Sequence, residues 1–202
     1  MLALLALLAV TAVWGVTFVQ VKDAVALYPL FAFLAVRFAI AAAVLALPAA
    51  GRLRGLGRSG WTAGTALGLL LALGYALQTA GLERTTVSSA GFITGLYVVF
   101  TPLLGLLLFR TRVGRAVWLG VVLSVTGLAL LSGVGAGDPA GDLLVLGGAA
   151  AYSLQIALME RYAPRYDPIG FTQIEMIAAF AGFAIVAAAL GQVELPRGWT
   201  VW

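Results

Sequence analysis

Two charged side chains lie deep inside long apolar stretches of the chain, where a charge needs a partner or water. Arg37 lies in the middle of the apolar run 29–48, and Glu175 is the one acidic residue well inside such a run, 169–190. An arginine at the centre of a helix in lipid costs about 3 kcal/mol on insertion scales. Both residues are therefore candidates for lining a polar pathway and for pairing with each other. The alternative is that each bonds only to nearby backbone carbonyls.

Aromatic residues also recur beside amides and hydroxyls inside the apolar runs. Tyr75 and Gln78 are three residues apart, and two further tyrosines repeat this spacing with Thr94 and Gln155. A spacing of three places both side chains on one face of a helix. Together they suit a cavity for a small amphipathic solute, although each alone equally fits an interhelical hydrogen bond or an interface anchor. The candidate cavity residues are Trp14, Thr17, Arg37, Tyr75, Gln78, Thr94, Tyr97, Tyr152, Gln155 and Glu175.

The residue types that are missing exclude several kinds of chemistry. The chain has no cysteine and no histidine, so disulfides, ordinary zinc or copper sites and Ser-His-Asp or Cys-His catalysis are excluded. The only lysine, Lys22, follows the first apolar run, so a retinal Schiff base in a late helix has no lysine to form on. We therefore expect no enzyme, no metal and no cofactor.

The composition indicates an integral membrane protein. Of the 202 residues, 62% are hydrophobic and 10% are charged, whereas about a quarter of an average soluble domain is charged. A soluble fold could not hide this much apolar surface, but a lipid bilayer solvates it. The net charge of +4 comes from arginines in short loops, so membrane topology explains it better than nucleic acid, which we exclude as a partner.

Seven apolar runs are long enough to cross a bilayer as helices, which takes about 20 residues each. They are continuously apolar rather than alternating, which favours helices over barrel strands. The first run lacks the basic start of a signal peptide, and an eighth run begins at Trp199. The predicted fold is an all-α polytopic membrane protein with spans at 2–21, 29–48, 61–81, 87–109, 115–133, 143–159 and 169–190.

The basic residues in the connections predict the orientation. Eight arginines follow or precede the runs on one side, against Lys22, Arg84 and Arg197 on the other. Because basic loops remain in the cytoplasm, we expect the amino terminus and the arginine-rich side to be cytoplasmic in a cell membrane. The arginines of that side are Arg52, Arg54, Arg58, Arg110, Arg112, Arg115, Arg161 and Arg165.

Glycines and one proline are candidates for helix packing or hinges. Gly64 and Gly68 are four apart, and Gly91 and Gly95 repeat that spacing. Such glycines share a helix face and let backbones approach closely, and small faces can also slide. Pro102 lies inside the fourth run, where a kink is expected, either as a structural bend or as a gate hinge.

A weak internal repeat has an offset of about 138 residues. Trp14-Gly15 and Tyr152-Ser153 each lie inside a run, and each run is followed by a short loop and a proline, Pro29 and Pro168. The offset nearly aligns Arg37 with Glu175. Because five helices separate the copies, the first and sixth helices run in opposite directions, which is the inverted-repeat plan of many secondary transporters.

The chain resembles the EamA-type branch of the drug/metabolite transporter superfamily over essentially its whole length. The most specific part is residues 77–96, LQTAGLERTTVSSAGFITGL, followed by Pro102. Further matching positions are Trp14-Gly15, Arg37, Trp118-Leu119-Gly120 and Thr126-Gly127. Where the family commonly has a Glu-Arg pair, this chain has Thr111 and Arg112, so nothing can be argued from that glutamate.

The resemblance implies a carrier of ten helices built from two inverted five-helix repeats. It predicts a first repeat at 1–133 and an incomplete second repeat at 142–202, so the chain is expected to be truncated after seven helices and the start of an eighth. The implied function is a secondary carrier for small metabolites such as amino acids, usually in efflux, by alternating access. The expected partners are a small-molecule substrate and the lipid bilayer, with a homodimer left open. The alternative is a non-transporting membrane fragment, or a structural or partner-binding membrane protein.

Overall fold

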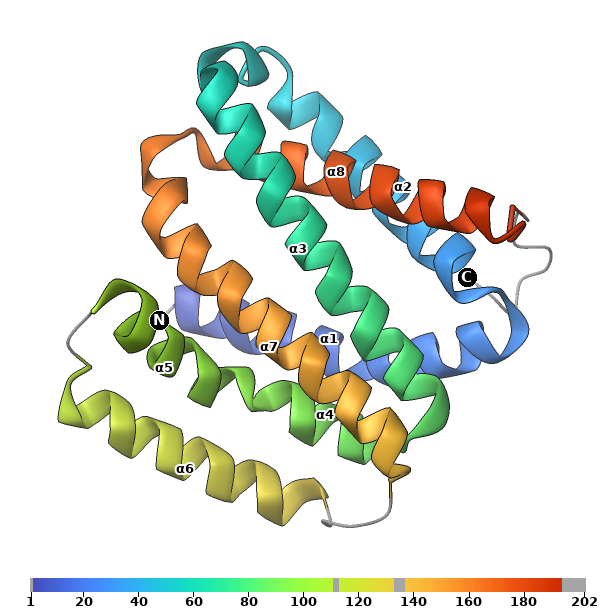
Figure 1. Ribbon diagram of the computed structural model, residues 1–202. Coiled ribbons are helices and arrows are strands. Elements are labelled where there is room, and N and C mark those ends of the chain that lie inside the picture. The colour runs from blue at the N-terminus through green and yellow to red at the C-terminus, as the bar shows by residue number, and fades with distance from the viewer. Residues whose placement is uncertain (1, 111–112, 133–136, 194–202) are drawn as a thin grey trace.

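The computed structural model describes residues 2–110, 113–132 and 137–193, and this part of the chain folds into helices without strands. The predicted all-α fold is confirmed. Figure 1 shows the helices as a bundle with α3 near its middle. The elements are α1 (Leu2–Leu27), α2 (Leu30–Ala49), η1 (Leu53–Leu56), α3 (Gly57–Arg84), α4 (Val87–Gly95), α5 (Tyr97–Phe109), α6 (Arg115–Ser132), α7 (Pro139–Tyr162), η2 (Ala163–Arg165) and α8 (Pro168–Ala189).

Every predicted run within the described residues coincides with a helix, and the fourth run is covered by α4 and α5 together. Six helical segments of this part of the chain are long and apolar enough to cross a bilayer. The fifth predicted span contributes a shorter apolar stretch, Arg115–Gly127, within α6. The eighth run, from Trp199, lies outside the described residues. Length and composition thus indicate a multi-pass membrane protein.

An Asp-Pro pair begins both α7 and α8. Asp138 accepts a hydrogen bond from the Gly141 amide at 3.1 Å, and Pro139 opens the helix behind it. Asp167 accepts from the Gly170 amide at 2.9 Å ahead of Pro168. A carboxylate cap satisfies an amide that has no partner within the helix, and proline is favoured in the first turn because its missing donor costs nothing there. The sequence therefore fixes where these two helices start.

Glycines of α3 bring it into close contact with α8. A Cβ atom placed on Gly64 would lie 2.9 Å from Ile174 Cγ2, and one on Gly68 would lie 2.5 Å from the carbonyl oxygen of Glu175. Further along, a Cβ on Gly81 would lie 2.5 Å from the carbonyl oxygen of Gly141 in α7. Only glycine fits at these positions, so small residues set the spacing of the helices around α3.

The second glycine pair behaves differently. A Cβ on Gly91 would meet nothing within 4 Å, and Gly91 and Gly95 line an open pocket. The close packing expected at Gly91 is therefore not seen among the described residues, because the pocket separates this face of α4 from α1. The helix break lies at Leu96, between α4 and α5, while Pro102 lies inside α5. The Leu96 amide donates to the Ile93 carbonyl at 3.1 Å, a tighter turn that interrupts the α-helix ahead of the proline.

The connections alternate between two ends of the bundle. In Figure 1, α2 meets α3 and α7 meets α8 toward one end, whereas α1 meets α2 and α3 meets α4 toward the other. Apolar side chains fill the space between the helices. One cluster joins α2, α3 and α8 through Leu34, Phe38, Ala72, Ala179 and Phe183, and it lies directly beside Arg37.

Candidate functional site

A pocket lined by α1, α2 and α3 contains five of the predicted cavity residues. The space among its side chains is about 260 Å³ when space open to the outside is included, and in this conformation it has room for about one water molecule. Its walls combine one cation, three aromatic side chains, an amide and two threonine hydroxyls with apolar side chains. The lining residues are Trp14, Thr17, Phe18, Val21, Arg37, Tyr75, Gln78, Thr79 and Leu82. We refer to it as the Arg37 pocket.

Arg37 lies over an aromatic ring. Its guanidinium carbon is 5.4 Å from the centroid of the Tyr75 ring, within the range of a cation–π contact. The side chain is half-buried. A guanidinium is charged at every physiological pH, so the pocket carries a permanent positive charge. It can accept an anionic group of a solute, while the rings take an apolar part.

The Tyr75 ring is held from two sides. The ring of Tyr152 meets it edge-on at 5.4 Å between centroids, and the ring of Phe38 meets it edge-on at 5.0 Å. Edge-to-face aromatic pairs at this spacing are favourable beyond the area they bury. Residues from α2 and α7 thus fix the platform beneath the Arg37 guanidinium. Sequence reasoning missed Phe38, whose only signal was its place next to Arg37.

A buried chain of hydrogen bonds crosses three helices behind the pocket. The Tyr152 hydroxyl donates to Gln78 Oε1 at 3.0 Å, and Gln78 Nε2 donates to Thr94 Oγ1 at 2.9 Å. The three side chains come from α7, α3 and α4, and all are buried. The two bonds fix the orientation of the Gln78 amide. The predicted residues are therefore brought together across helices, not along one helix face.

A second and wider pocket opens beside the first. Trp14 lines both, and its ring lies 6.3 Å from that of Tyr97. Thr17 donates to the Trp14 carbonyl at 2.6 Å, so its hydroxyl hydrogen is used within α1. The second pocket encloses about 610 Å³, including space open to the outside. Its lining residues are Thr11, Trp14, Gly15, Phe18, Val87, Gly91, Thr94, Gly95 and Tyr97.

Glu175 and Gln155 form a separate buried pair. Gln155 Nε2 donates to Glu175 Oε1 at 2.9 Å, and the two side chains are 8% and 2% exposed. Among the described residues no ion pair joins Glu175 to Arg37, so the proposed pairing of these two residues is not formed. Each is the eighth residue of its helix, but α2 and α8 run in opposite directions (Figure 1). Arg37 and Glu175 consequently lie about two turns from helix ends that are at opposite ends of the bundle.

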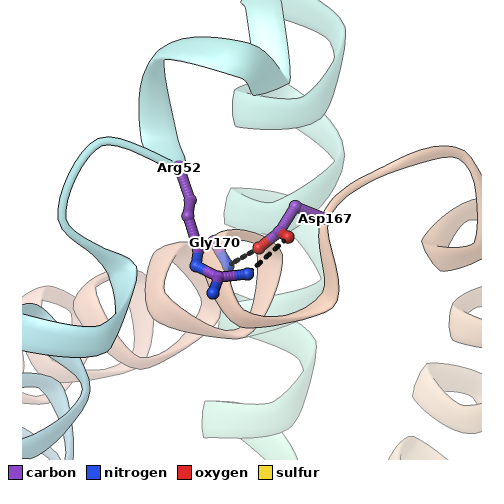
Figure 2. A network of polar contacts seen from close by, with 3 residues as sticks. All are labelled: Arg52, Asp167 and Gly170. Carbon is purple, nitrogen blue, oxygen red and sulfur yellow. Dashed lines mark hydrogen bonds and ion pairs between the residues drawn. The ribbon is translucent and has the colours of Figure 1, made fainter.

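At one end of the bundle a partly exposed ion pair, shown in Figure 2, links two segments that are far apart in the sequence. Arg52 Nη1 donates to Asp167 Oδ2 at 2.9 Å, while Asp167 Oδ1 accepts from the Gly170 amide at 2.9 Å. The Gly170 amide, followed by the Arg52 guanidinium, holds the pKa of the Asp167 carboxyl below its usual value. This Arg52 clamp joins the connection between α2 and α3 to the start of α8.

At the opposite end of the bundle, a second set of polar contacts joins the helices. Asp142 Oδ1 of α7 accepts from Thr85 Oγ1 at 2.5 Å and from Ser89 Oγ at 2.7 Å. Lys22 Nζ of α1 donates to the carbonyl of Leu82 at 3.1 Å and to that of Thr85. This Asp142 clamp joins four helices at their ends. Sequence reasoning missed both clamps, because their partners are between 53 and 115 residues apart.

Comparison with known proteins adds a family and a relative. The model of the EamA-like transporter family matches residues 1–133. A protein of Archaeoglobus fulgidus described as an uncharacterized transporter is 36% identical over 183 residues. The aligned part covers 90% of this chain and 54% of that relative, so the chain spans about half of the relative's length.

Proposed function

The chain belongs to the EamA-like transporter family, and from that membership we propose that it acts as a secondary carrier for small metabolites. The observation that carries the proposal is the Arg37 pocket, in which a permanent, half-buried cation lies within a largely apolar helix bundle. An arginine is costly at such a depth, and the aromatic rings and the amide beside it suit the binding of a solute. Binding of a solute would offset the cost.

The lining of the pocket favours a small amphipathic anion or zwitterion. The Arg37 guanidinium offers donors for a carboxylate, and Gln78 offers a fixed amide whose carbonyl oxygen is used by Tyr152. The Trp14 and Tyr75 rings lie beside these groups and suit an apolar side chain. Amino acids and related compounds have this combination of groups.

Alternating access is the mechanism that we propose for the carrier. The Arg52 clamp and the Asp142 clamp link helices at opposite ends of the bundle, so separation of one while the other holds would open the pocket to one side at a time. The glycines of α3 give this helix a smooth surface against Ile174 and Ala178 of α8, and helix faces made of small residues can slide past one another. A bundle packed in this way can rock.

We propose that the fold is an inverted repeat, an arrangement that permits this motion. Helices α2 and α8 begin at Leu30 and Pro168. The displacement between these two starts agrees with the offset of the sequence repeat. The family match ends at residue 133, where the first predicted repeat ends. The arginine-rich connections favour a cytoplasmic amino terminus in a cell membrane, and we propose efflux as the direction.

Solute binding to variants of the purified protein tests the proposal. Wild-type protein in lipid vesicles is screened with radiolabelled amino acids and related anions, and the solute that binds is then measured with Arg37→Ala. Removal of a charge-assisted hydrogen bond costs about 1.5–3 kcal/mol, so affinity should fall about ten- to hundred-fold. Arg54→Ala, an exposed arginine of the neighbouring connection, is the matched control. Equal affinity in wild type and Arg37→Ala would show that the pocket is not the binding site.

A further inference from the structure

The Glu175 carboxyl is buried without a cation. It is 2% exposed and lies at the eighth position of α8, about 10 Å along the helix axis from its start. Among the described residues, its side-chain hydrogen-bond donor is the neutral amide of Gln155. On the α3 side Gly68 lies against the Glu175 backbone, so closely that no side chain intervenes. The Arg37 pocket does not include Glu175.

The helices packed against α8 bring no charge to this carboxyl. The charged residue of α2 is Arg37, which lies over Tyr75, and the other charged groups stand near the helix ends. Within the described residues no ion pair reaches Glu175, and α8 itself carries no other charge. The charged and titratable groups on the surrounding elements are Arg37, Arg54, Arg58, Tyr75, Glu83, Arg84, Asp142, Tyr152, Glu160, Arg161, Tyr162 and Arg165.

A carboxylate in an apolar interior is unfavourable unless a cation or several donors compensate it. One amide donor is too little, whereas a neutral carboxylic acid is satisfied by that donor and by an acceptor for its proton. Since Oε1 accepts from Gln155, the proton would bond to Oε2. We infer that Glu175 is a proton-binding site that takes up a proton from water on one side of the membrane and releases it on the other during the transport cycle. This inference rests on the proposed function.

The geometry links this site to the Arg37 pocket. Gln155 and Tyr152 lie three residues apart on α7, so they share a helix face. Tyr152 bonds to Gln78 and meets the Tyr75 ring beneath Arg37. A shift of α7 that exposes Glu175 to water therefore also displaces two walls of the pocket. The same movement of α7 would therefore couple proton binding at Glu175 to solute binding in the Arg37 pocket.

The test uses Glu175→Gln, a neutral mimic of the protonated acid that still accepts from Gln155. Glu160→Gln, an exposed carboxyl on the same helix as Gln155, is the control. The proteins are placed in vesicles that contain a pH-sensitive dye, and uptake of the bound solute is measured with and without a pH gradient. For wild type and Glu160→Gln the gradient should raise uptake several-fold and the dye should report proton movement. For Glu175→Gln both effects should vanish, while solute affinity stays within about two-fold and exchange without a gradient persists.

A second measurement does not depend on transport. At neutral pH the infrared spectrum of the wild-type protein in lipid should show the carbonyl stretch of a protonated carboxyl, and that band should be missing in Glu175→Gln. Absence of the band in the wild type, or gradient-driven uptake in Glu175→Gln equal to the wild type, would refute the proton site. Failure of the wild type to bind any solute, with the band present, would instead refute the proposed function.

Discussion

The contact between α3 and α8 makes a prediction whose size and sign can be worked from the coordinates. An alanine Cβ at position 68 would lie 2.5 Å from the Glu175 carbonyl oxygen and 2.7 Å from its Cα, whereas ordinary contact begins at 3.4 Å. The obstacle is backbone, which cannot rotate away as a side chain does, so α3 and α8 must separate by about 1 Å. Gly68→Ala therefore strains the interface that surrounds Glu175.

The expected cost follows from the known penalty for overpacking. Inserting a methyl group into a filled interior costs about 1–3 kcal/mol. The higher helix preference of alanine over glycine offsets about 0.5–1 kcal/mol of this cost, so the net loss is about 0–2.5 kcal/mol. For a chain of this length each kcal/mol lowers the melting temperature by about 2–4 °C, so Tm should fall by up to about 10 °C.

The chain contains its own control for this measurement. A Cβ at Gly91 in α4 would meet nothing within 4 Å, so Gly91→Ala keeps the gain in helix preference without the clash. Its Tm should rise by about 1–4 °C. Melting of both variants in detergent is followed by the fluorescence of the tryptophans. If Gly68→Ala melts above the wild-type temperature by as much as Gly91→Ala does, the close approach of α3 to α8 is not present and the reasoning fails.

Three further predictions use other contacts. Tyr152→Phe leaves Gln78 Oε1 buried without its donor, so the free energy of unfolding should fall by about 1–3 kcal/mol. This is measured as a fall in Tm that Tyr162→Phe, at a half-buried position near the end of the same helix, does not share. The pKa of Asp167 is lowered in the folded state, so its stabilisation is present above the ordinary carboxyl pKa and is lost as pH falls through the folded value. The Tm difference between wild type and Asp167→Asn should therefore be seen at pH 7 and vanish in strong acid; a constant difference would contradict the clamp. Reporters fused after Arg58 and after Arg112 should read cytoplasmic and one after Gly137 external, and the reversed pattern would overturn the topology.

The helices could be predicted from the sequence because lipid imposes a simple rule. A backbone in hydrocarbon must satisfy its own hydrogen bonds, so each long apolar run had to be a helix, and each described run is one. The resemblance to the EamA family, drawn from residues 77–96 and a few further positions, is confirmed by the family match over 1–133. Polar residues inside such runs are rare enough to be noticed without a structure, which is why Arg37 and Gln78 were found.

The partners of those residues could not be predicted, because partnership depends on how helices rotate and tilt against one another. Spacing along one helix paired Tyr152 with Gln155, but Tyr152 bonds to Gln78 and Gln155 bonds to Glu175. The opposite charges of Arg37 and Glu175 suggested an ion pair. In the structure the Arg37 guanidinium instead lies over the Tyr75 ring. The glycine spacing of four is equally ambiguous, since it marks a helix contact at Gly64 and an open face at Gly91.

The separation of Arg37 from Glu175 has a consequence for how a carrier of this kind could work. Under the proposed inverted repeat the two residues occupy equivalent places in α2 and α8, yet they differ in chemistry: a guanidinium keeps its charge, whereas a carboxyl exchanges its charge with a proton. Had they paired, each would have neutralised the other, and neither a solute anion nor a proton would find a free site. Because Arg37 lies over Tyr75 and Glu175 is bonded to Gln155, under the proposed function one residue would select the solute while the other responds to pH. A Gln155→Ala variant removes the donor that favours the charged form of Glu175, so the pH dependence of uptake should shift to higher pH while solute affinity stays within about two-fold; an unchanged pH dependence would contradict this division of roles.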